Sequence, residues 1–219
     1  MSTIVNTLQS FDVEGITYTM PKKVGGHYSV CAQYADQNGV AGGKMYFQTP
    51  KMKIQSDFVD QSELLNSFVD VVCEDESFIK GIKEFDDTIF NTIKEKRSEW
   101  FPNKTIDDTF LEVGQTHSLM KNNVIRAHVD KGVQLFDLQK ESVTPGMIVK
   151  NSTVRCIFQY MGVWFTTNRW GITWNIVQML HYPDRQNGKE ATKQYDYMFP
   201  DEEHEELHDD DTPTPPPGV

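Results

Sequence analysis

The chain has 219 residues, of which 38% are hydrophobic and 24% charged, enough for one domain of moderate size or two small ones. Its three cysteines lie far apart and show no CxxC or Cys/His spacing, which argues against a disulfide framework or structural zinc. No apolar run approaches the ~20 residues of a membrane helix, and the first residues lack the features of a secretory signal. We therefore expect a soluble, intracellular protein in a reducing compartment, with no membrane partner.

The net charge of −11 is concentrated near the C-terminus. Residues 201–211 contain eight carboxylates and no lysine or arginine. Of the 32 acidic side chains in the chain, 24 therefore remain elsewhere, against 21 basic ones, which leaves a charge of −3 on residues 1–200. The acidic overall charge thus does not exclude a nucleic-acid partner, because such binding depends on local clusters.

The first third of the chain favours short strands. Residues 11–34 combine β-forming residues with a tight bend at Gly25-Gly26, and residues 36–39 form a strong turn signal. The segment KMYFQTPKMKI, at residues 44–54, predicts a strand that lies at an edge or is bent or bulged at Pro50. Alternation of apolar and polar residues predicts another strand over 65–73.

The hydrophobic period then changes to that of an amphipathic helix over Glu74–Arg97. Its apolar stripe consists of Phe78, Ile82, Phe85, Ile89 and Ile93. Pro102 is expected to end the helix. After it we expect a loop-rich stretch over 103–123, and then strands near 124–129, 133–138 and 147–149.

The segment from Val154 to Leu180 predicts a β-hairpin that contains three of the four tryptophans. Its polar turn is Thr166–Arg169. Large rings flanked by arginines suit stacking on unpaired bases, where each stacked base is worth ~1–3 kcal/mol.

Alternation along this hairpin assigns faces to its rings. It predicts that Trp174 lies in the core and that Trp164 and Phe165 point to opposite faces. Trp170, beside the polar turn, is either a stacking platform or a packing anchor.

The strand 44–54 carries three lysines interleaved with Tyr46 and Phe47. They suit a groove that follows phosphates, with bases on the rings. They also suit an edge strand that uses lysines against aggregation, which is the interpretation that these residues alone favour. Both interpretations stay open.

The catalytic motif GxSxG does not occur. His204 and His208 stand four apart in the pattern HExxH and could bind a metal, but the segment around them is so polar and acidic that we expect it to be disordered. The pairs Asp86-Asp87 and Asp107-Asp108 are explained by helix-surface and loop charges. We therefore expect no enzyme, no cofactor and no metal site.

The last 19 residues, Asp201–Val219, combine the eight carboxylates with four prolines and predict a disordered tail. Such a tail serves solubility, or it mimics the nucleic-acid backbone and occupies a cationic groove until DNA displaces it. Once displaced, it would be free to contact replication proteins.

Three segments together resemble the OB-fold single-stranded-DNA-binding proteins of nucleo-cytoplasmic large DNA viruses. They are KMYFQTPKMKI, the helix that ends near EWF, and MGVWFTTNRWGITWNIVQM, and the resemblance spans roughly Lys44 to Leu180. It implies a five-stranded barrel-like sheet with extra strands and a helix, which binds single strands during viral DNA replication. Phage single-strand binders with an OB domain and an acidic tail offer a looser likeness.

We therefore predict a mainly β, OB-fold-like domain over residues 1–200, with an inserted helix at about 75–97 and a disordered tail at 201–219. The predicted function is non-catalytic, sequence-independent single-stranded DNA binding in replication, recombination or repair. The alternative is a β-domain whose aromatic hairpin docks a protein or carbohydrate partner. A preference for RNA and a homo-oligomeric state stay open. The predicted binding residues are Lys44, Tyr46, Lys51, Lys53, Arg155, Tyr160, Trp164, Arg169 and Trp170.

Overall fold

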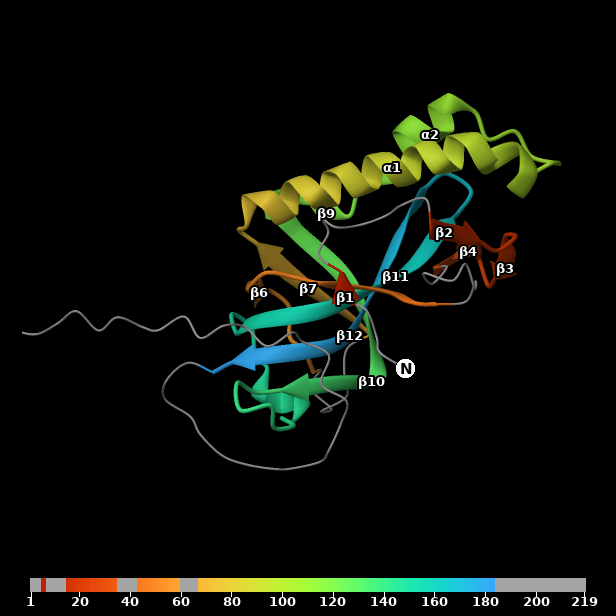
Figure 1. The fold of residues 1–219 in the computed structure, drawn as a ribbon. Helices are drawn as coiled ribbons and strands as arrows, with labels where there is room; N and C mark the ends of the chain where they lie inside the picture. The colour runs from red at the N-terminus through yellow and green to blue at the C-terminus, as the bar shows by residue number, and fades with distance from the viewer. Residues whose placement is uncertain (1–4, 7–14, 35–42, 60–66, 184–219) are drawn as a thin grey trace, which may run out of the picture.

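The centre of the fold is a closed barrel of five strands (Figure 1). The computed structural model describes residues 5–6, 15–34, 43–59 and 67–183, and within them the ring runs β6-β7-β10-β12-β11 and back to β6. Only the pair β10–β12 is parallel in this ring. These strands are β6 (Met52–Ile54), β7 (Phe68–Cys73), β10 (Val124–Phe136), β11 (Thr153–Phe165) and β12 (Trp170–Tyr182). This connectivity confirms the predicted OB-type barrel and the predicted aromatic hairpin.

Shorter strands extend the barrel on both sides of the hairpin. One edge of β11 pairs first with β6, then with β5 and finally with β4, while its other edge pairs with β12 throughout. The strands β2 and β3 pair with β4, β1 pairs with β5, β8 pairs with β12, and β9 pairs with β10. Their bounds are β1 (Val5–Asn6), β2 (Ile16–Tyr18), β3 (Lys22–Val24), β4 (His27–Tyr34), β5 (Met45–Gln48), β8 (Gln115–Thr116) and β9 (Leu119–Met120).

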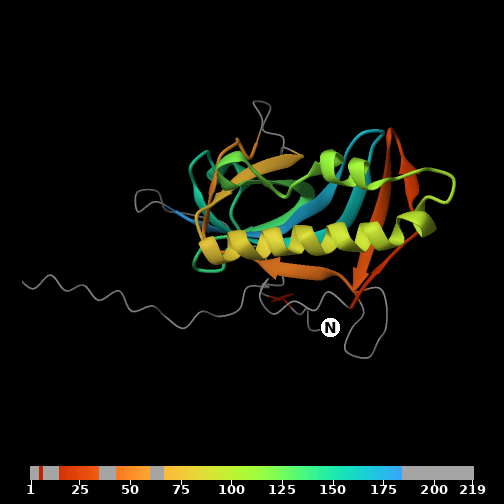
Figure 2. The same cartoon turned by 90° about the horizontal axis from the view of Figure 1, so that it is seen from above.

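The long helix α1 (Glu76–Trp100) lies against one side of the barrel and runs along it (Figures 1 and 2). All five residues of the predicted stripe are buried, because this face packs on the sheet. The side chain of Asp75 caps the first turn by accepting the backbone N–H of Phe78 at 2.7 Å. In the middle of α1, the ring of Phe85 lies 5.0 Å from that of Tyr160 and 5.2 Å from that of Trp174.

Several local predictions need correction. The predicted loop at 103–123 contains a second helix, α2 (Asp108–Gly114), and the 3-10 turn η3 (Lys121–Asn123). The two strands predicted over 124–138 form one strand, β10. The strand predicted over 147–149 is wrong, because Pro145 starts the 3-10 turn η4 (Pro145–Met147) there.

Other local predictions are confirmed. Gly25 adopts a φ of +56° in the turn between β3 and β4, as the Gly25-Gly26 bend requires. The chain breaks around Pro50 into β5 and β6, as the expected bend requires. The turn at 36–39, the linker after Pro183 and the acidic tail lie outside the described residues. Among the helices that the structure describes, none has the length and apolar character to cross a membrane.

Candidate nucleic-acid interface

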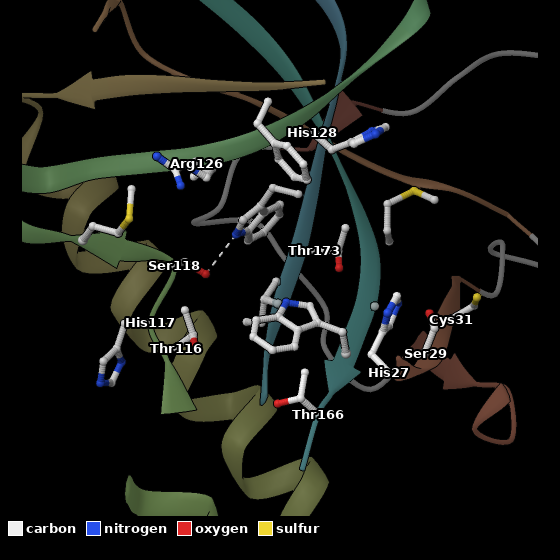
Figure 3. Close-up of a pocket in the computed structure, with 17 residues that line it drawn as sticks. His27, Ser29, Cys31, Thr116, His117, Ser118, Arg126, His128, Thr166 and Thr173 are labelled. Atoms are coloured by element: carbon white, nitrogen blue, oxygen red, sulfur yellow. Dashed lines mark hydrogen bonds between the residues drawn. The ribbon is translucent and has the colours of Figure 1, made fainter. Parts of the chain in front are cut away.

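A groove of about 610 Å³ lies where β7 and β10 face the ends of β4, β11 and β12 (Figure 3). We call it the barrel groove. In the view of Figure 3, Thr116, His117 and Ser118 lie on one side and residues of β4 on the other. It is lined by His27, Ser29, Cys31, Phe68, Thr116, His117, Ser118, Met120, Arg126, His128, Met161, Gly162, Trp164, Thr166, Ile172, Thr173 and Trp174.

Three large apolar side chains of the groove are exposed. The exposed fractions are 55% for Phe68, 37% for Met120 and 38% for Met161. In β7 the buried residues Val69 and Val71 alternate with outward positions, so the strand must point Phe68 away from the core. These three side chains line one groove, and exposed apolar surface gathered in this way is typical of places where a ligand or partner binds.

The ring of Trp164 lies in the groove because its cross-strand neighbour is Gly171. A Cβ atom at position 171 would lie 2.8 Å from the indole Cζ2 atom, so only glycine leaves the ring room to lie on β12. The next residue, Phe165, points into the core and is buried. This confirms the prediction that the two rings lie on opposite faces.

Arg126 supplies a fixed cation at the groove. Its guanidinium donates two hydrogen bonds of 2.7 Å to the carboxylate of Asp70, the residue opposite on β7. This pairing raises the pKa of Arg126 and holds its guanidinium in a defined plane, while further N–H donors remain for a ligand. Beside it, the rings of Phe68 and His128 meet edge to face at 5.3 Å.

Gly162 brings β4 close enough to form one wall of the groove. The glycine has a φ of +124°, and a Cβ atom there would lie 2.0 Å from the backbone oxygen of Val30. Glycine is the residue type that tolerates both this positive φ and this close approach of a neighbouring backbone. The pairing of β4 with β11 that results places His27, Ser29 and Cys31 along the groove.

A buried polar network forms the opposite wall. The carboxylate of Asp86, on α1, accepts the backbone N–H of Ser118 at 2.8 Å and its hydroxyl at 2.6 Å. The same hydroxyl accepts the indole N–H of Trp174 at 2.9 Å (Figure 3). Trp174 is otherwise buried, as predicted. The helix therefore fixes both the groove floor and the segment that carries His117.

Burial raises the pKa of Asp86, although the two bonds from Ser118 oppose the rise. The folded state therefore binds the proton of Asp86 more tightly than the unfolded chain does. The resulting contribution to the free energy of unfolding is fully present below the unfolded pKa of about 3.9 and is lost as pH rises through the folded pKa. Relative to Asp86→Asn, which stays neutral, the wild-type protein should lose free energy of unfolding as pH rises above the unfolded pKa of about 3.9. Urea denaturation of both proteins below and above this pH measures the difference. If the difference in free energy of unfolding between the two proteins does not change with pH, the pKa of Asp86 is not raised in the folded protein.

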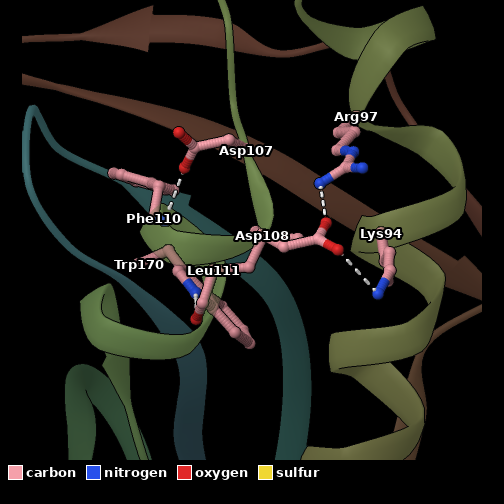
Figure 4. Close-up of polar contacts among 7 residues, drawn as sticks. All are labelled: Lys94, Arg97, Asp107, Asp108, Phe110, Leu111 and Trp170. Carbon is pink, nitrogen blue, oxygen red and sulfur yellow. Dashed lines mark hydrogen bonds and ion pairs between the residues drawn. The ribbon is translucent and has the colours of Figure 1, made fainter.

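Two predicted stacking residues are buried. Trp170 is 0% exposed and donates its indole N–H to the backbone oxygen of Leu111 at 2.9 Å (Figure 4). Tyr160 is 1% exposed, with its hydroxyl 3.4 Å from that of Tyr18. The prediction that these two rings offer stacking surface is wrong, because α1, α2 and the N-terminal strands cover them. Trp164 is the predicted ring that lines the groove.

The predicted cations do not gather around Trp164. Lys44, Lys51 and Lys53 are exposed and Arg155 is half-buried, and none of the four lines the barrel groove. The ammonium of Lys51 lies 4.8 Å from the centroid of the Tyr182 ring, elsewhere on the barrel.

Two further predicted residues have different surroundings. Arg169 is exposed in the tight turn whose first residue, Thr166, lines the groove. Tyr46 is partly buried against a small apolar cluster that includes Phe136 and Leu180. Neither side chain is among the residues that line the groove.

Sequence reasoning missed most of the groove, including Phe68, Met120, Arg126, His128 and Met161. The available signal was the alternation of β7, which puts Phe68 on the outward face next to a paired arginine and aspartate. It becomes informative only once β7 and β10 are known to be neighbours.

The solved structures similar to this chain include single-stranded DNA-binding proteins of two bacteriophages. The C-terminally truncated protein of bacteriophage Enc34 matches with a TM-score of 0.43 and 12% identity, over 78% of this chain and 97% of that one. The Enc34 protein in complex with ssDNA gives 0.43 and 11%, over 76% and 96%. The gp2.5 protein of bacteriophage T7 gives 0.42 and 8%, over 68% and 98%.

A search among curated proteins finds no match. A family model matches residues 59–201, which include β7, both α-helices and the aromatic hairpin. By this match over more than half of its length, the chain belongs to the family described as "Family of unknown function (DUF5871)".

Proposed function

We propose that this protein binds single-stranded DNA in the barrel groove, without base-sequence preference. The observation that carries the proposal is the set of exposed apolar side chains on β7, β9 and β11 that line one groove. β7 and β10 are the second and third strands of the barrel, and OB-folds bind oligonucleotides across this face. An apolar lining accepts any base, because every base has a π-face.

The charges of the groove fit a backbone contact rather than base reading. Among the described residues, Arg126 is the one lysine or arginine that lines the groove. Its pairing with Asp70 fixes it beside Phe68. In this arrangement Phe68 and Trp164 stack on bases while Arg126 meets a phosphate. In duplex DNA the base faces are stacked inside the helix, so they cannot contact the apolar surface of the groove.

The proposal for the wider biological setting rests on the resemblance of the sequence to viral single-strand binders. We propose a role in DNA replication, recombination or repair of a large DNA virus, in the host cell where viral DNA replicates, with no catalytic step. Residues 1–200 would form the binding domain. The acidic tail at 201–219 would compete with DNA and, once displaced, contact replication proteins. A homo-oligomer is compatible with this role.

Binding of labelled dT oligomers, duplex of equal length and the matching RNA tests the proposal by fluorescence anisotropy. We expect single strands to bind more tightly than duplex, with log K falling against log salt by about 0.7 per phosphate contacted. Equal affinity for single strand and duplex at physiological salt would contradict it. Binding to oligosaccharides, or to a protein partner with no salt dependence, would favour the alternative β-domain functions.

A further inference from the structure

A second pocket lies on the other face of the sheet that forms one wall of the barrel groove. It has a volume of about 480 Å³, and we call it the turn pocket. It is lined by Lys23, Gly26, Tyr28, Phe101, Lys104, Thr105, Ile106, Phe110, Phe165, Thr166 and Thr167. We propose, resting on the proposed function, that the turn pocket binds the sugar–phosphate backbone of the nucleotides that follow those in the barrel groove.

The strand register shows that the two pockets share one wall. Directly paired residues of a sheet point to the same face. Ser29 pairs with Trp164, and both line the barrel groove. The next pair, Tyr28 and Phe165, lines the turn pocket. A wall one strand layer thick therefore separates the two pockets.

The turn between β11 and β12 forms the open edge of this wall. Thr166 lines both pockets, and its backbone N–H is bound to the backbone oxygen of Arg169 at 2.7 Å, which makes the turn tight. A chain that leaves the groove past Trp164 reaches the turn pocket by crossing this residue. Arg169 is exposed on the same turn.

The chemistry of the turn pocket suits a phosphodiester. Lys23 and Lys104 are exposed, and among the described residues neither forms a salt bridge. The ammonium of Lys104 lies 4.2 Å from the centroid of the Tyr28 ring, which holds the cation at the pocket without neutralising it. The hydroxyls of Thr105 and Thr167 add donors of the kind that contact phosphate oxygens, whereas that of Thr166 donates within the turn to the backbone oxygen of Arg169 at 3.1 Å.

Two neighbouring cations on α1 are paired with a carboxylate. Lys94 and Arg97, on α1, are both paired with Asp108 at the start of α2 (Figure 4). They lower the pKa of this carboxyl, Lys94 most, and do not line the turn pocket. Lys23 and Lys104, by contrast, line the turn pocket and pair with no carboxylate among the described residues.

The test compares oligo-dT lengths from about 4 to 16 nucleotides, the range of site sizes of OB-folds. The variant K23Q/K104Q removes the two charges, and K80Q/K83Q removes two charges from the exposed face of α1 as a matched control. For the longest oligomer, K23Q/K104Q should bind about tenfold more weakly at 0.15 M salt, with a salt slope smaller by about 1.4. The shortest oligomer should bind all three proteins equally, and thermal melting verifies that each is folded.

The outcomes separate this proposal from the function on which it rests. If the wild-type protein binds no single strand of any length, the proposed function fails. If short and long oligomers bind the wild-type protein but K23Q/K104Q retains the full affinity and salt slope for the long one, the turn pocket is not part of the path. An equal loss for short and long oligomers, or the same loss in K80Q/K83Q, would show a general charge effect and overturn the proposal as well.

Discussion

Trp170→Ala is expected to lower the free energy of unfolding by about 3–5 kcal/mol, the usual cost of removing a large buried ring. The ring is fully buried, it lies 6.2 Å from that of Phe90 on α1, and its N–H bond to Leu111 ties α2 to the barrel. The variant loses both the packing of the ring and the hydrogen bond to the backbone oxygen of Leu111. Urea denaturation followed by circular dichroism measures the change.

Trp164→Ala provides the matched control, because Trp164 and Trp170 lie in the same hairpin but on different faces. The half-buried Trp164 should cost less stability than Trp170 when replaced. If Trp170→Ala unfolds at the same urea concentration as the wild-type protein, the packing of α2 on the hairpin is not as the structure shows.

The double variant F68A/W164A is expected to lose about 2–6 kcal/mol of single-strand binding free energy, since each stacked base contributes ~1–3 kcal/mol. The two rings belong to strands on different sides of the barrel groove, so their removal takes away both stacking surfaces. Fluorescence anisotropy with labelled oligo-dT measures the loss. The slope of log K against log salt should stay unchanged, because the rings contact no phosphate.

Leu138→Ala is the control for loss of exposed apolar surface. Leu138 is exposed and lies outside the barrel groove, so its replacement should leave binding unchanged. An affinity of F68A/W164A within a factor of two of the wild-type value would mean that single strands bind elsewhere on the molecule. The residues around Lys51 and Arg155 would then be the next to test.

The parts of the fold that could be predicted are those with strong local periodicity. The α1 stripe repeats every three to four residues from Phe78 to Ile93, so the buried face of the helix can be assigned without knowing what packs against it. The helix α2 has only 7 residues, and α2 depends on the Asp107 cap and on the contact with Trp170. Propensity alone cannot indicate such an element.

The site was harder to predict because its residues come from strands that are distant in sequence. Alternation assigns Trp164 and Phe165 to opposite faces but cannot say which face another element covers. Trp170 stands beside a polar turn, where exposure was as reasonable as burial, and it is α2 that covers it. The lysines of residues 44–54 suggested a groove by composition, whereas the register of β5, β6 and β11 places them away from Trp164.

The groove wall also provides a chemical handle. Cys31 is exposed there, whereas Cys73 and Cys156 are buried, and burial raises the pKa of both buried thiols. Since reaction with maleimides requires an accessible thiolate, a dye added to the native protein should attach at Cys31 and leave the other two thiols untouched. The unaltered sequence thus allows a single fluorophore to be placed beside the groove, where its emission would report occupancy in real time.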